Sequence, residues 1–446
     1  MWSRSIFIPL FIIAGLCSAA FSQTYHFDFG SGTATEGYTR VSPNSWYNAA
    51  TGYGFEPGAV LEAVERKTGT GVYRDFISSA KPFLFSVKLP EGNYHVKIML
   101  GDAEGNSATT IRAENRRLFY AHIITQKGKF ITAELTIHIR DSVIRDETGN
   151  PIGKVKLKPR EITYPNWDDK LTLEFNDTAI KVCAIEIVPD KKSTTVFLAG
   201  NSTVVDQDKE PWAAWGQMFP AFFEPGNIAI ANYAESGETL KAFKGERRLQ
   251  KLWSMAKPGD YIFIEFAHND QKPGGSFLDP FTTYAATLKE WIAEARTHLL
   301  IPVLVTSMHR RAFDSAGHII NTLLDYPEAM RQTAKAENVA LIDLNAMSKE
   351  LYETWGKEKS LKAFVHFPAN TFPGQTTELK DDTHFSTYGA YELARCIVQS
   401  LKDQQSPLAK YFRKDIPYFD PTQPDEWENW YWPLSPSFAS QKPDGN

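Results

Sequence analysis

The stretch TVFLAGNST at residues 195–203 is the clearest indication of the fold, because a short apolar run ends there in a glycine, an asparagine and a serine. Such a run predicts a buried strand that stops at a sharp turn. Further apolar runs of this kind occur at 228–233, 261–266, 302–306 and 340–344. Because apolar residues between 284 and 299 have helical spacing, we expect helices between the strands. The pattern predicts a three-layer α/β/α domain with about five parallel strands over residues 194–418.

Candidate reactive residues follow the first three of these strands. Sheets of this type bind ligands at the carboxyl ends of their strands. Ser202 follows the first strand, Gly237 the second and Asn269 the third. Taken alone, the serine would more often cap a helix, and the other two would more often only shape a loop. Their succession predicts one site, with the serine as nucleophile and three donors for an oxyanion: the amides of Ser202 and Gly237 and the side chain of Asn269.

A second block, Asp381-Asp382-Thr383-His384, lies near the end of the same domain. A nucleophilic serine needs a histidine base whose other ring nitrogen is held by a carboxylate. Asp381 and His384 are three residues apart, so a tight turn would pair them. A block of this kind on its own is more often a solvated loop, and the two-residue spacing makes Asp382 the weaker partner. Together with Ser202, the block predicts a catalytic triad of Ser202, Asp381 and His384.

These ordered blocks resemble those of the SGNH (GDSL-type) hydrolase superfamily, whose signature residues are a serine, a glycine, an asparagine and a histidine. The resemblance implies the same roles for Ser202, Gly237, Asn269, Asp381 and His384. The sequence departs from the family pattern at two positions: Asn201 stands where an aspartate usually precedes the serine, and Ala267 where a glycine is usual. Neither position touches a reacting atom in the family's mechanism, so the expected reaction is unchanged.

Within the superfamily, the runs at 197–206, 212–215 and 383–386 are most similar to rhamnogalacturonan acetylesterases. The resemblance implies an esterase that removes acetyl groups from pectin through an acetyl-enzyme, with no metal or organic cofactor. One alternative is an acetylesterase of xylan or another hemicellulose. Another, from a different class, is a glycan-binding protein with a degenerate hydrolase domain, although every reacting residue is present.

Three basic residues, His309, Arg310 and Arg311, follow the fourth strand run. Cations at that edge of the sheet would suit the carboxylates of galacturonate, although a solvated basic loop is an equal alternative. The tail at 419–446 is rich in tryptophan and proline. We expect its aromatic residues to pin it to the domain rather than to stack on sugars, and its polar end from Ser437 to be disordered.

Residues 23–190 have strand-like patterns and no convincing amphipathic helix, which predicts an all-β sandwich. The runs at 83–89 and 94–100, across a Pro/Gly/Asn turn, read as a β-hairpin. Together with the Phe27-Asp28-Phe29-Gly30 segment, they resemble galactose-binding-like and malectin-like modules. Such a domain would either bind glycan or support the hydrolase domain. A polar stretch at 189–193 marks the expected boundary between the two domains.

The chain as a whole has 446 residues, 42% of them hydrophobic and 23% charged, which is enough for two cores. Residues 1–22 have the layout of a signal peptide, so we expect a secreted or periplasmic protein. No later apolar run is long enough to predict a membrane span. A net charge of −5 without a long basic run argues against nucleic acid as a partner. An uncharged or acidic polymer is compatible with this charge, and the resemblance implies an acetylated polysaccharide or oligosaccharide as the substrate.

The remaining sequence signals concern cysteines and cofactors. Cys183 and Cys396 fall in different domains, so we expect two buried free thiols rather than a disulfide. The histidines include no close pair with metal-ligand spacing, which disfavours a metalloenzyme. The strand ending at Gly200 lacks the glycine spacing that binds a dinucleotide.

Overall fold

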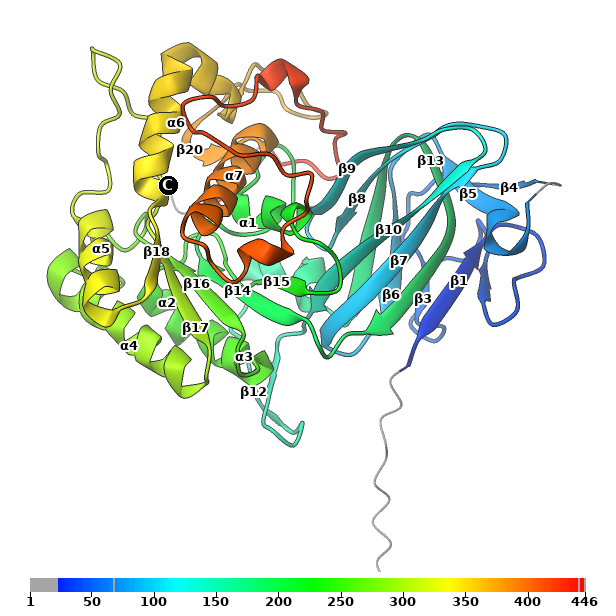
Figure 1. The fold of residues 1–446 in the computed structure, drawn as a ribbon, viewed down its shortest axis with the longest axis horizontal. Helices are drawn as coiled ribbons and strands as arrows, with labels where there is room; N and C mark the ends of the chain where they lie inside the picture. The colour runs from blue at the N-terminus through cyan, green and yellow to red at the C-terminus, as the bar shows by residue number, and fades with distance from the viewer. Residues whose placement is uncertain (1–22, 67–68, 440–441, 445–446) are drawn as a thin grey trace, which may run out of the picture.

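The computed structural model describes residues 23–66, 69–439 and 442–444, so the expected signal peptide at 1–22 lies outside the described residues. A β-rich amino-terminal part lies beside a mixed α/β part (Figure 1). This division confirms the expected combination of a β-rich domain and an α/β domain. No helix within the described ranges is long and apolar enough to cross a membrane.

The amino-terminal part is built around one long bent strand, β13 (Lys170–Pro189). Its first half pairs with β6 and β8, and its second half pairs with β1, β5 and β7. Two sheets therefore face each other across an apolar core. The other strands of this part are β1 (Tyr25–Phe29), β2 (Thr39–Val41), β3 (Tyr53–Phe55), β4 (Glu62–Glu65), β5 (Asp75–Ser79), β6 (Phe83–Lys88), β7 (Gly92–Asp102), β8 (Ser107–Ala113), β9 (Arg117–Thr125) and β10 (Lys129–Ile139).

The prediction that the runs at 83–89 and 94–100 form a β-hairpin is wrong. β6 pairs with the first half of β13, whereas β7 pairs with its second half and with β10. Both strands bury alternate side chains in one core, including Phe85 from β6 and Ile98 from β7. Because the same alternation arises whether two strands pair or face each other across a core, the sequence pattern did not distinguish a hairpin from a crossing between sheets.

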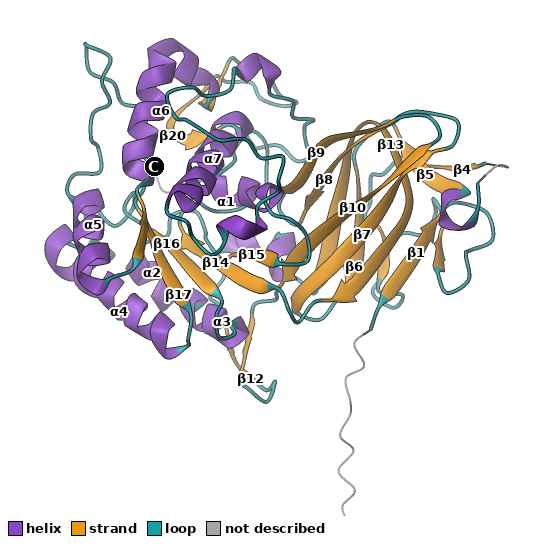
Figure 2. Cartoon of the chain, viewed as in Figure 1, coloured by secondary structure: helices purple, strands orange, loops and turns teal. Residues whose placement is uncertain are grey.

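A segment between β10 and β13 leaves the sandwich and lies on the α/β part. It contains a small hairpin, β11 (Val143–Arg145) and β12 (Pro151–Lys154), and two short helical turns, η2 (Pro159–Thr163) and η3 (Pro165–Trp167). Three of its side chains, Ile144, Val155 and Trp167, belong to a core cluster of the α/β part. Figure 2 shows the hairpin projecting beside α3 (Arg248–Met255).

The α/β part has a parallel sheet in the order β18-β17-β16-β14-β15. Its strands lie within two residues of the expected apolar runs at every end: β14 (Thr194–Gly200), β15 (Ile228–Asn232), β16 (Tyr261–Glu265), β17 (Ile301–Val305) and β18 (Ala340–Ile342). The edge strand β15 also contacts β10 through Ile137 and Ile230, so the sheet continues into the sandwich.

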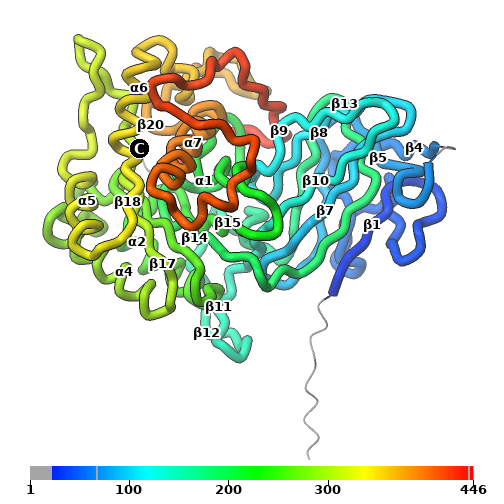
Figure 3. The backbone as a smooth tube through the Cα atoms, in the orientation of Figure 1, coloured from blue at the N-terminus to red at the C-terminus, as the bar shows by residue number. Residues whose placement is uncertain are grey.

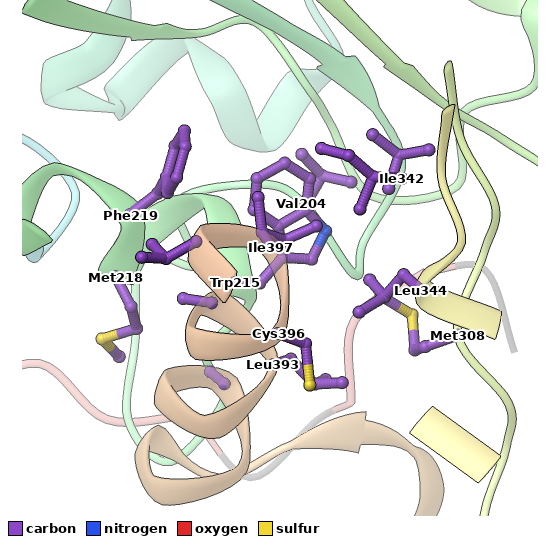
Figure 4. Packing of buried hydrophobic residues seen from close by; sticks show 14 of the residues in the cluster. Val204, Trp215, Met218, Phe219, Met308, Ile342, Leu344, Leu393, Cys396 and Ile397 are labelled. Atoms are coloured by element: carbon purple, nitrogen blue, oxygen red, sulfur yellow. The ribbon is translucent and has the colours of Figure 1, made fainter. Parts of the chain in front are cut away.

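Helices cover both faces of this parallel sheet (Figures 1 and 3). One face packs against a core that includes Trp215 and Ile397 (Figure 4), and the other against a core that includes Trp291. The helices are α1 (Trp215–Met218), α2 (Leu240–Gly245), α3 (Arg248–Met255), α4 (Ala285–Thr297), α5 (Tyr326–Glu337), α6 (Leu344–Lys359) and α7 (Thr387–Asp403). A small antiparallel pair, β19 (Phe364–Phe367) and β20 (Leu379–Phe385), precedes α7.

The carboxyl-terminal tail returns across both parts. Trp432 donates from its indole nitrogen to Glu210, and Tyr431 donates from its hydroxyl to Asp177, so these aromatic residues fix the tail as expected. Residues 437–439 also pair with the backbone of Glu210, which differs from the disorder expected after Ser437. Residues 440–441 and 445–446 lie outside the described residues.

The two cysteines of the described chain are buried and free, as expected. Cys183 lies in β13 of the sandwich and Cys396 lies in α7 of the α/β part. Burial raises the pKa of both thiols, so neither has the character of a reactive thiolate.

Candidate active site

Ser202 lies in a tight turn directly after β14 and is 1% exposed. The carboxamide oxygen of Asn201 shapes this turn by accepting hydrogen bonds from the backbone nitrogen and the hydroxyl of Thr203, at 3.0 and 2.8 Å. Gly200 has no room for a side chain, because an added Cβ would lie 2.8 Å from the Cβ of Val204. The turn therefore holds the Ser202 hydroxyl at the carboxyl end of the sheet.

His384 connects Ser202 to Asp381 through both of its ring nitrogens. Its Nε2 lies 2.8 Å from the Ser202 Oγ, and its Nδ1 lies 2.7 Å from the Asp381 Oδ2. The other oxygen of Asp381 accepts from the backbone nitrogens of Thr383 and His384, at 2.9 and 3.0 Å. The indole nitrogen of Trp212 lies 3.3 Å from the Asp381 Oδ2. Hydrogen bonds thus run unbroken from the carboxylate to the serine.

The expected tight turn at 381–384 is instead an irregular part of β20. Phe385 pairs with Phe364 and Asp381 with Val365, so residues 382–384 form a bulge between two paired positions. A bulge re-aims the side chains of its strand, which explains how Asp381 and His384 meet at three-residue spacing in extended backbone.

The pKa of Asp381 is lowered from its ordinary value of 3.8 to about 2. Burial alone would raise this pKa, but the hydrogen bond and the charge of His384, together with the two backbone amides, outweigh burial. The carboxylate therefore stays ionised at any pH well above 2. An ionised orienting group is what a histidine base requires.

The three expected oxyanion donors follow three adjacent strands, because β14 lies between β15 and β16. Gly237 has a φ of +83°, a left-handed conformation that favours glycine. The side-chain nitrogen of Asn269 donates to the carbonyl of Glu238, at 3.0 Å, which ties the loop after β16 to the loop after β15. The structure thus brings these residues to one edge of the sheet, and their oxyanion role stays a prediction.

Glu265, the last residue of β16, is a buried carboxylate that the sequence did not indicate. It accepts hydrogen bonds from the hydroxyls of Thr203 and Ser307 and from the indole of Trp215, at 3.1, 2.9 and 2.8 Å. Burial raises its pKa to about 7, although the three donors oppose that rise. Glu265 therefore braces the turn that holds Ser202.

The three basic residues after β17 have different surroundings. His309 is buried, and its backbone nitrogen donates to Ser348; burial lowers its pKa to about 4. The guanidinium of Arg310 donates to the carbonyl of His268, at 3.3 Å, so it lies beside the loop after β16. Arg311 forms an ion pair with Asp382 of β20, at 3.0 Å. Their expected contact with substrate carboxylates stays a prediction.

A cleft of about 270 Å³ lies alongside the triad. Two of its residues contact the triad: the Gln207 side chain donates to the Ser202 carbonyl at 2.9 Å, and Trp212 donates to Asp381. The cleft is lined by Arg160, Tyr164, Gln207, Asp208, Lys209, Trp212, Ser236, Ala439, Lys442, Pro443 and Asp444. Arg160 was missed in the sequence, where the basic run KLKPR at 156–160 was its one signal.

Comparisons with known proteins match the two parts of the chain separately. Residues 25–145 match a family model described as Beta-agarase/YXIM esterase-like, galactose-binding domain-like. Residues 198–390 match the model of the GDSL-like Lipase/Acylhydrolase family.

Two relatives and one solved structure come from Bacillus subtilis. Rhamnogalacturonan acetylesterase RhgT is 41% identical over 220 residues, which cover 49% of this chain and 94% of that protein. The uncharacterized esterase YxiM is 25% identical over 417 residues, which cover 90% of this chain and 98% of that protein. A crystal structure of the YxiM protein has a TM-score of 0.45 and 24% identity, covering 86% of this chain and 99% of that chain.

Proposed function

Because this chain belongs to the GDSL-like lipase/acylhydrolase family, we propose that it removes O-acetyl groups from a plant cell-wall polysaccharide, with rhamnogalacturonan as the substrate. Membership of the family makes the chain a carboxylic ester hydrolase. The observation that carries the proposal is the hydrogen-bonded series Ser202–His384–Asp381. The choice of sugar is supported by the 41% identity to a rhamnogalacturonan acetylesterase.

In the proposed acylation step, His384 acts as the general base. Its Nε2 takes the proton of the Ser202 hydroxyl, 2.8 Å away, while the oxygen attacks the acetyl carbonyl. Asp381 accepts from the Nδ1 of His384, so it fixes the tautomer and stabilises the imidazolium that forms. The sugar hydroxyl leaves with the proton that His384 returns.

The oxyanion of each tetrahedral intermediate requires donors that are held in place beforehand. We assign this role to the backbone amides of Ser202 and Gly237 and to the side chain of Asn269. The Asn269 amide has two N–H groups, and only one is needed for the carbonyl of Glu238. Deacylation repeats the sequence with water as the nucleophile and releases acetate.

The proposal is tested by acetate release from acetylated rhamnogalacturonan and acetylated xylan in parallel, with wild type beside Ser202→Ala. We expect release by wild type alone and chiefly from the pectic polymer. Equal release from both polymers would retain the esterase and remove the pectin assignment. Binding of either glycan without any acetate release would favour a glycan-binding protein with an inactive hydrolase domain.

A further inference from the structure

The segment that follows β12 brings two cations from the sandwich side to the edge of the active site. Glu161 anchors this segment: its Oε2 accepts from the backbone of Lys158, and its Oε1 accepts from Arg248 and Trp167 at 2.8 and 3.0 Å. Glu161 and Arg248 are both fully buried. The preceding and following residues are therefore held firmly against the α/β part.

Arg160 is oriented by two groups of the loop after β15. Its Nε and Nη2 lie 2.9 and 2.6 Å from one oxygen of Glu235, and its Nη2 also donates to the carbonyl of Ser236 at 2.8 Å. These bonds leave Nη1 directed into the cleft, where it pairs with the carboxylate of Asp444 in the tail. The Arg160 side chain is 33% exposed. A preoriented guanidinium thus already binds a carboxylate in the cleft.

This carboxylate lies beside a proposed oxyanion residue. A Cβ added to Gly237 would lie 3.2 Å from the Cβ of Asp444. Lys158 supports the same loop, because its Nζ donates to the carbonyl of Ser236 at 2.6 Å and lies 2.5 Å from Glu238. The other charged groups that line the cleft are Asp208, Lys209 and Lys442. Asp208 lies 3.4 Å from Lys209 and Asp444 pairs with Arg160, so the cations that line the cleft outnumber its carboxylates by Lys442.

We propose that Arg160 binds the carboxylate of a uronate residue that neighbours the acetylated sugar, and that Asp444 competes for this position. The inference rests on the proposed function and makes Arg160 a specificity-determining residue contributed from outside the hydrolase domain. Arginine suits the role because its guanidinium is always charged and its planar fork matches a carboxylate. A neutral polymer such as xylan has no group for this site.

The first test compares Arg160→Gln with wild type on two forms of one substrate: acetylated rhamnogalacturonan oligosaccharides, and the same oligosaccharides with their carboxyl groups reduced to alcohols. We expect Arg160→Gln to lower kcat/KM on the acidic form by about tenfold more than on the reduced form. Lys156→Gln is the matched control, because it removes one exposed cation from the same segment. Equal losses on both forms, as from a general disturbance of the fold, would overturn the inference.

A second test does not require pectin to be the substrate. Digalacturonate without acetyl groups is used as an inhibitor of p-nitrophenyl acetate hydrolysis. We expect its inhibition constant to rise about tenfold in Arg160→Gln and to fall in Asp444→Asn, because the second variant removes the competing carboxylate. An unchanged constant in both variants would overturn the inference. Inhibition without acetate release from acetylated rhamnogalacturonan would overturn the proposed substrate and retain the uronate site.

Discussion

At the scale of single residues, the Ser202 hydroxyl and the His384 ring form the reacting pair. Without the hydroxyl no acetyl-enzyme can form, and without the ring the hydroxyl keeps its proton. We expect Ser202→Ala and His384→Ala to lower kcat by about 10⁴-fold or more, measured as acetate release. Ser315→Ala is a matched control, because Ser315 is an exposed loop serine. Either triad variant retaining a tenth of wild-type turnover would contradict the assignment.

We expect the Asp381 carboxylate to contribute to the stability of the protein as well as to its rate of turnover. Its pKa is lowered to about 2 in the folded protein, so its contribution is present above the ordinary value near 4 and is lost as pH falls through about 2. This shift corresponds to about 2 kcal/mol of unfolding free energy. We expect Asp381→Asn to lower kcat by about 10³-fold or more, because the amide no longer stabilises the imidazolium.

Denaturant unfolding at pH 6 and pH 2.5 measures the stability part of that prediction. Wild type should lose more stability between these two pH values than Asp381→Asn, which has no carboxylate to protonate at this position. The same loss in both proteins would show that the hydrogen bonds around Asp381 do not favour its ionised form.

At the scale of elements, Glu265 connects the ends of β14, β16 and β17 and the start of α1. Its pKa is raised to about 7, so folding favours its neutral form. The stability that it contributes is complete below its ordinary value of 4.5 and is lost as pH rises through about 7. We expect the unfolding free energy of wild type to fall by about 3 kcal/mol relative to Glu265→Gln between pH 4.5 and 8.

Glu265→Leu separates the charge of Glu265 from its hydrogen bonds. Leucine leaves the buried donors of Ser307 and Trp215 without the Glu265 acceptor, which we expect to cost about 3 kcal/mol at pH 5. It should also lower kcat, because the bond from Thr203, which adjoins the nucleophile, is lost. Glutamine can accept from Trp215 and donate to the two hydroxyls, so Glu265→Gln should retain kcat within about threefold. Equal kcat in the two variants would show that Glu265 does not position Ser202.

Some of the elements and site residues could be predicted from the sequence, and others could not. The parallel strands were predictable, because a strand buried on both faces reads as a continuous apolar run. The bulge at 382–384 was not, since it depends on the pairing of Asp381 with Val365. Arg160 was missed because it belongs to the segment that leaves the sandwich and packs on the α/β part. No local sequence pattern indicates that packing. Glu265 lay inside an expected apolar strand run, and its three partners are distant in sequence.

In the whole molecule, the sandwich and the α/β part are joined by a buried ion pair as well as by the pairing of β10 with β15. Arg117 of β9 is fully buried, and its Nε and Nη2 lie 2.9 and 2.7 Å from one oxygen of Asp206, which is equally buried. Asp206 belongs to the segment that follows Ser202, and the side chain of Asn232 donates to its other oxygen at 2.8 Å. An arginine of the sandwich therefore holds the nucleophile's own segment.

We expect Arg117→Leu to lower the unfolding free energy by about 3 to 5 kcal/mol, because it leaves the Asp206 carboxylate buried without its cation. Turnover should fall as well, since residues 202–207 lose their anchor. Calorimetry should show one unfolding transition in wild type, shifted as a whole in the variant, because Leu118 of β9 packs into the core of the α/β part. Adding Asp206→Asn should recover part of the lost stability, since it removes the unpaired charge.

The matched control is Arg66→Leu, which removes the ion pair of Arg66 with Asp102 inside the sandwich, at 2.8 Å, and does not touch the Ser202 segment. It should lower stability less, because Arg66 is 24% exposed and Lys181 still pairs with Asp102. It should also leave kcat unchanged. Two separate transitions in wild type, with Arg117→Leu shifting only one, would mean that the parts fold independently. The sandwich would then be an appended module rather than a support for the catalytic serine.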